Sequence, residues 1–111
     1  QAAAGAAQAL RTAGLSQNVL SVSIDGTCAG LQMIKDGSLS ATVMQFWLKM
    51  VDMSMDAAYK LLTTGEKPAV TPGLNYYDTG VTLATDRPAP GVPSITADEA
   101  IKLRGAMCAK G

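Results

Sequence analysis

Two polar residues stand at the ends of two predicted strands. Asp25 closes the segment NVLSVSID, and Gln45 closes the segment ATVMQ. A short helix is predicted between them, so we expect the strands to run parallel and to place both side chains at the carboxyl edge of one sheet. A carboxylate accepts hydrogen bonds, an amide donates and accepts them, and each sugar hydroxyl also does both. The pair therefore indicates a polyhydroxylated ligand.

Each of these residues also has a simpler interpretation. Asp-Gly is a favoured turn dipeptide, so Asp25 could serve only to close a turn. Gln45 could be no more than the polar end of a strand. Trp47 follows closely and could stack on a sugar face, although aromatic residues in such a helix more often belong to a core.

The composition excludes several function classes. The 111 residues include no histidine, which removes Ser-His-Asp and Cys-His catalysis and the commonest transition-metal ligand, so most hydrolase mechanisms are excluded and no metal site is expected. An enzyme of the flavodoxin-like class remains an alternative at this point. Nine basic and nine acidic residues balance, and no two basic residues are adjacent, so no nucleic-acid partner is expected. The segment AAAGAAQ lacks the second glycine of a phosphate-binding loop, and no cofactor is expected.

Cys28 and Cys108 lie far apart in the sequence and in no metal-binding spacing. One disulfide in an oxidising compartment and two buried thiols that act as small hydrophobes are both compatible with the pattern. The sequence leaves these two alternatives open.

The hydrophobic pattern predicts an α/β chain. Helices are expected at about 2–13, at 28–36, at 47–64 with a stop at Gly65, and from about Ile95. Strands are expected at 19–25, which looks internal to a sheet, at 38–45, and at 80–85. In the last helix Thr96 and Glu99 form a capping box, and the apolar stripe is Ala100, Leu103 and Met107.

Six motifs follow one another along nearly the whole chain: AAGAAQALRTAGL, SIDGT, IKDG, ATVMQ, LLTTGE and TGVTLATDRP. In this order they resemble the carboxy-terminal portion of periplasmic sugar-binding proteins of the ribose-binding type, which are type 1 periplasmic binding proteins. These receptors hold a sugar or related polyol between two lobes and deliver it to an ABC importer. They carry out no chemistry of their own, so the resemblance implies that the chain is not an enzyme. The resemblance implies sugar-binding roles for Asp25 and Gln45 and a periplasmic or extracellular location.

The resemblance also implies a fold and a division of the chain. The fold is a flavodoxin-like or Rossmann-like βαβ lobe with three layers, here incomplete. Residues 1–45 match part of the second, carboxy-terminal sugar-binding lobe, 46–72 a crossover helix of the first lobe, and 73–111 a return strand and carboxy-terminal helix. The rest of the first lobe has no counterpart, so we expect a fragment that associates with the remainder of its parent chain or with copies of itself.

The effector-binding domain of a lactose-repressor-type transcription regulator shares this fold and is the alternative. Such a regulator carries an amino-terminal helix-turn-helix and a basic arm, and the chain shows neither. ATVMQ followed by a long amphipathic helix, together with the cysteine pair, favours the exported receptor.

Overall fold

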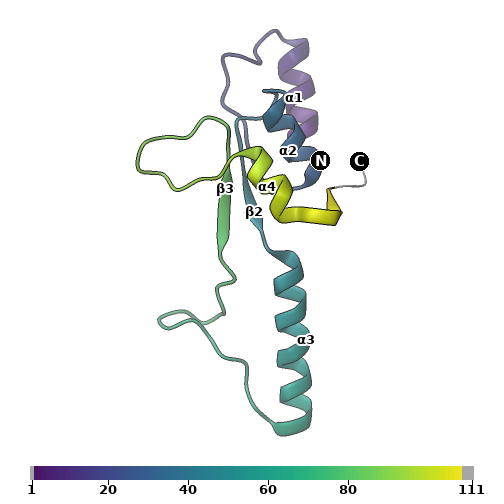
Figure 1. The fold of residues 1–111 in the computed structure, drawn as a ribbon, viewed down its shortest axis with the longest axis vertical. Helices are drawn as coiled ribbons and strands as arrows, with labels where there is room; N and C mark the ends of the chain where they lie inside the picture. Colours follow the sequence, from purple (N-terminus) through teal and green to yellow (C-terminus); the bar gives the residue numbers. More distant parts are fainter. Residues whose placement is uncertain (1, 109–111) are drawn as a thin grey trace. The chain divides into compact units, whose positions relative to one another are not determined.

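The computed structural model describes residues 2–108, which form two compact units. The first unit contains the chain up to Gln45 and again from Thr82 onward, and the second unit contains Phe46–Val81. The elements, in chain order, are α1 Ala2–Thr12, β1 Val22–Asp25, α2 Cys28–Lys35, β2 Ala41–Gln45, α3 Trp47–Thr64, β3 Val81–Ala84, α4 Ala97–Arg104 and the 3₁₀ turn η1 Gly105–Met107 (Figure 1). The chain is therefore α/β, as predicted.

Three helix ends coincide with caps that the sequence provides. Thr27 accepts a hydrogen bond from the Gly30 N–H and begins α2. Gly65 adopts a left-handed conformation, with a φ of 74°, and ends α3 at the predicted position. Thr96 and Glu99 form the predicted capping box of α4.

The sheet has the order β1-β2-β3, so β1 lies at an edge. β1 and β2 are parallel, as predicted, and Ile24 lies opposite Val43. The prediction of an internal first strand is wrong within the described residues: the strand begins only at Val22, which is 63% exposed, and Ile24 is 65% exposed. A run of β-branched residues favours an extended backbone but does not determine the place of a strand in its sheet.

One face of the sheet carries the core of the first unit. Helix α2 contacts both β2 and α4. The core cluster consists of the buried apolar side chains of Leu31, Ile34, Leu39, Met44, Ala84, Ala97 and Ala100. Three of the seven are alanines, so the helices approach closely and gain little buried area per residue.

The second unit consists of α3 and the irregular segment that follows it. None of the residues of α3 is buried, although the helix is amphipathic as predicted. A hollow of about 760 Å³ lies beside the helix and is lined by side chains that include Met50, Met53, Leu61, Tyr76 and Tyr77. None of the described helices combines the length and the apolar character that crossing a membrane requires.

Candidate functional site

Asp25 and Gln45 lie together at the carboxyl ends of β1 and β2. Gln45 Nε2 donates a hydrogen bond of 2.9 Å to Asp25 Oδ1. Asp25 is exposed and Gln45 is partly exposed. Among the described residues no other hydrogen bond reaches either side chain, so both keep free acceptor positions and the amide keeps one free N–H.

The strand register alone would separate this pair. Asp25 lies opposite Met44, and residues that lie opposite each other point to the same face of a sheet. Met44 and Thr42 point into the core, so regular alternation would turn Asp25 inward and Gln45 toward the other face. Instead Asp25 has a φ of 90°, and this rotation about N–Cα carries its carboxylate out to Gln45.

Asp25 is the only non-glycine residue with positive φ in the described part of the chain. Such a conformation costs roughly 1–3 kcal/mol and persists only when the surroundings impose it. It also occurs disproportionately at binding sites. The contacts of the turn Asp25–Gly26–Thr27, called here the site turn, show how it is imposed.

Gly26 is fitted closely against the neighbouring strand. Its φ is 57°, and a Cβ at this position would lie 2.9 Å from Met44 Cα, so only glycine fits. The Gly26 N–H donates a 3.3 Å hydrogen bond to the buried Thr42 Oγ1, which also accepts one of 2.8 Å from the Ser23 hydroxyl. Thr42 therefore holds the site turn from the side of β2.

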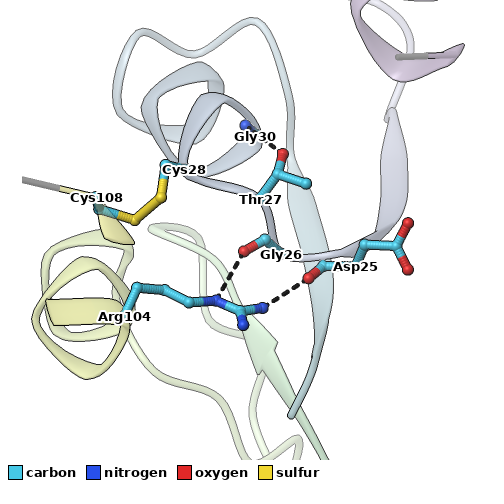
Figure 2. Close-up of a disulfide and its surroundings, with 7 residues drawn as sticks. All are labelled: Asp25, Gly26, Thr27, Cys28, Gly30, Arg104 and Cys108. Atoms are coloured by element: carbon cyan, nitrogen blue, oxygen red, sulfur yellow. Dashed lines mark hydrogen bonds between the residues drawn. A yellow bond between two sulfur atoms is a disulfide. The ribbon is translucent and has the colours of Figure 1, made fainter. Parts of the chain in front are cut away.

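Arg104 holds the site turn from the side of α4. Its Nη2 donates a 2.7 Å hydrogen bond to the Asp25 carbonyl oxygen, and its Nε donates one of 3.1 Å to the Gly26 carbonyl oxygen. Figure 2 shows the guanidinium directed at these two backbone oxygens, with the Asp25 carboxylate pointing away from it. Arg104 is only 8% exposed, and its hydrogen bond to Gly26 is buried while the one to Asp25 is partly buried.

The disulfide Cys28–Cys108 adds a covalent connection beside the site turn. The two Cα atoms lie 5.3 Å apart, within the normal range for a disulfide. Cys28 opens α2 directly after the site turn, and Cys108 follows η1 at the end of α4 (Figure 2). Of the two alternatives for the cysteines, the structure contains the disulfide.

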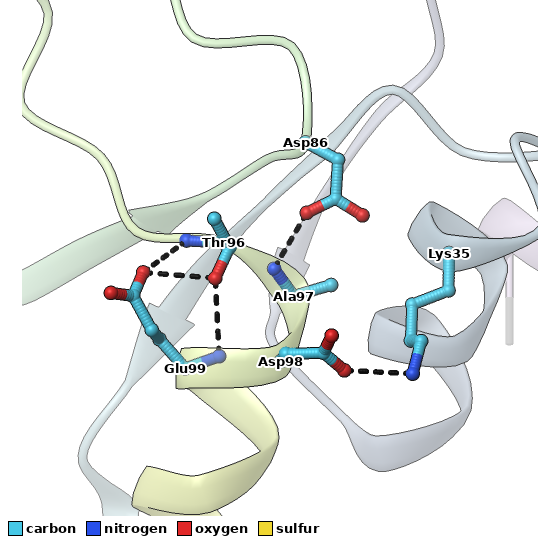
Figure 3. A network of polar contacts seen from close by, with 6 residues as sticks. All are labelled: Lys35, Asp86, Thr96, Ala97, Asp98 and Glu99. Atoms are coloured by element: carbon cyan, nitrogen blue, oxygen red, sulfur yellow. Dashed lines mark hydrogen bonds and ion pairs between the residues drawn. The ribbon is translucent and has the colours of Figure 1, made fainter.

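A polar network fixes the first turn of α4, the helix that carries Arg104 (Figure 3). Asp86 accepts a 2.9 Å hydrogen bond from the Ala97 N–H, and Lys35 of α2 forms a 2.7 Å ion pair with Asp98. Hydrogen bonds from the Thr96 N–H and hydroxyl lower the pKa of Glu99, and the hydrogen bond from Lys35 lowers the pKa of Asp98. The same contact raises the pKa of Lys35.

Trp47 belongs to the second unit, where it begins α3 and is 48% exposed. Among the described residues, no cluster of cysteine and carboxylate side chains could hold a metal ion.

Sequence reasoning missed Arg104 and Thr42. The predicted stripe of α4 included Leu103, which is 63% exposed, whereas Ala97, Ala100 and Arg104 face inward. These residues are separated by three and then four positions, so they lie on one face of the helix, and that face ends in an arginine. A lone arginine on a face of small residues was the available signal.

The pair is suited to binding neighbouring hydroxyl groups. Asp25 accepts hydrogen bonds through its carboxylate, while the Gln45 amide can donate to one hydroxyl oxygen and accept from another hydroxyl. Bonds to the carboxylate are charge-assisted and stronger than bonds between neutral groups.

No protein-family model matches the chain, and no curated protein matches it.

Proposed function

We propose that the chain is part of a solute-binding receptor for a sugar or related polyol. The observation that carries this proposal is the exposed Asp25–Gln45 pair, which a strained backbone turns outward at the carboxyl edge of two parallel strands. That edge is where open α/β sheets bind ligands. In this proposal the first unit is the incomplete flavodoxin-like sugar-binding lobe that the sequence motifs suggest.

The complete receptor would hold the sugar between two lobes and present it to an ABC permease, outside the cytoplasm. The disulfide Cys28–Cys108 supports an exported receptor over a lactose-repressor-type regulator, because stable disulfides are rare in the reducing cytosol. Exposed apolar side chains of α3, such as Leu62, which is 85% exposed, support the association of this helix with the remainder of a parent chain or with another copy.

A sugar panel tests the proposal on the chain as it is. Two-dimensional ¹H–¹⁵N spectra are recorded with D-ribose, D-galactose, D-xylose and myo-inositol at concentrations up to about 100 mM, because a single binding surface gives weak affinity. We expect at least one compound to move the signals of Asp25, Gly26 and the Gln45 side-chain amide in a saturable way. If no member of the panel moves these signals, or if the shifts lie only in Phe46–Val81, the proposal is wrong.

A further inference from the structure

The structure buries a cation where an apolar side chain would pack at lower cost. Burial of a charged group is unfavourable unless its hydrogen bonds are replaced. In the described part of the chain Arg104 forms no ion pair, and its recorded hydrogen bonds go to the backbone oxygens of Asp25 and Gly26. The arginine therefore acts on one feature, the site turn.

We propose that Arg104 is a positioning residue for ligand binding, an inference that rests on the function proposed above. By bonding both carbonyls it holds Asp25 at positive φ, and this φ presents the carboxylate beside Gln45. Without the guanidinium the site turn relaxes toward regular extended backbone, and the carboxylate leaves the amide. Arg104 thus contributes to sugar affinity without touching the sugar.

The shape of the guanidinium explains why arginine is required. Its planar fork carries donors at fixed angles, and here Nε and Nη2 reach two successive carbonyl oxygens at 3.1 and 2.7 Å. A lysine ammonium is a shorter point charge that cannot impose the same relative orientation on two carbonyls. Arg104→Lys should therefore retain the charge but lose the control of φ.

The disulfide helps to fix the position of Arg104 relative to the site turn. Cys28 is bonded to Cys108. Only Thr27 separates Cys28 from Gly26, and only the three residues of η1 separate Cys108 from Arg104. Both ends of the Arg104 contact are thus covalently connected by a short path. Relative movement of α4 and the site turn is restricted as a result.

The test compares Arg104→Met and Arg104→Lys with Lys102→Met, which changes an exposed cation of the same helix. Two readouts need no sugar: the three-bond HN–Hα coupling of Asp25, which reports φ, and the shift of the Gln45 side-chain amide, which reports its hydrogen bond. We expect both Arg104 variants to change both readouts and to raise the dissociation constant of the sugar by about tenfold. Lys102→Met should change none of them.

The outcomes separate this inference from the proposed function. Unchanged coupling and amide shift in a folded Arg104→Lys protein would overturn the positioning role, whatever sugar binds. Changed coupling and amide shift, in a protein that binds no sugar even as wild type, would support the control of the pair by Arg104 and contradict the proposed function. If Arg104→Met does not fold, Arg104→Lys, which keeps the charge and most of the aliphatic stem, decides alone.

Discussion

At Asp25 the backbone adopts a φ of 90°, which an L side chain rarely accepts. The outward position of the Asp25 carboxylate is therefore obtained at a cost in stability. The neighbouring Gly26 also has positive φ, but there the absence of a Cβ removes the strain and admits Met44. The two successive residues of the site turn thus differ: Asp25 presents a carboxylate to Gln45, and Gly26 allows close packing against β2.

Replacement of Asp25 by glycine or by alanine separates strain from chemistry. Both substitutions remove the carboxylate and its hydrogen bond with Gln45, but only glycine adopts this φ without steric strain. We predict that Asp25→Gly unfolds with a free energy about 1 kcal/mol larger than Asp25→Ala. Urea denaturation at neutral pH measures the difference, and equal free energies for the two variants would show that the turn is not strained.

Among the elements, α4 depends on ionised side chains at its first turn. The hydrogen bonds from Thr96 lower the pKa of Glu99 in the folded protein. A lowered folded-state pKa contributes stability above the ordinary carboxyl pKa of roughly 4, and this contribution is lost as the pH falls through the folded-state value. The hydrogen bond from Lys35 likewise lowers the pKa of Asp98, so Asp98 also contributes stability that is lost at low pH.

We therefore predict that the melting temperature of the wild type falls more steeply between about pH 5 and pH 2 than that of Glu99→Gln. Glutamine can complete a capping box but does not titrate in this range. Circular dichroism melts at a series of pH values measure both profiles. Parallel profiles would mean that Glu99 does not contribute to the acid sensitivity.

Much of the element structure could be predicted because local chemistry determines it. Gly65 ends α3 and Thr96 begins α4 at the expected residues, since caps act within one helical turn. The edge position of β1 and the inward face of α4 could not be predicted in this way, because both depend on which elements pack together. The Asp25–Gln45 pair was predicted from the strand ends, whereas the positive φ that brings the side chains together comes from Arg104 and Thr42, which are distant in sequence.

For the whole molecule, the disulfide closes a long loop. Cys28 and Cys108 are 80 residues apart, so their bond strongly restricts the unfolded chain. We predict that the double variant Cys28→Ser and Cys108→Ser loses about 2–5 kcal/mol of unfolding free energy. Reductant should lower the stability of the wild type and leave the double variant unchanged. No loss in either experiment would contradict a structural role for the disulfide.

The exposed apolar side chains of α3 predict association. Met55 and Leu62 are 68% and 85% exposed, and the helix has no buried residue. We expect sedimentation velocity to show species larger than the 11.4 kDa monomer, and the double variant Met55→Lys and Leu62→Lys to shift them toward monomer. Thr63→Lys, at another exposed position of α3, is the control. A wild type that stays monomeric at all concentrations would contradict this prediction.

The most direct test of the account is the sugar affinity of Asp25→Asn, measured by the spectral titration with the panel member that binds best. Asparagine keeps the size of the side chain and tolerates positive φ, but it removes the charge that strengthens the hydrogen bonds. Asp36→Asn changes an exposed carboxylate outside the site and serves as the control. We predict a dissociation constant at least about tenfold higher for Asp25→Asn and unchanged for Asp36→Asn. Equal affinities for wild type and Asp25→Asn would contradict the assignment of this carboxylate as a sugar ligand.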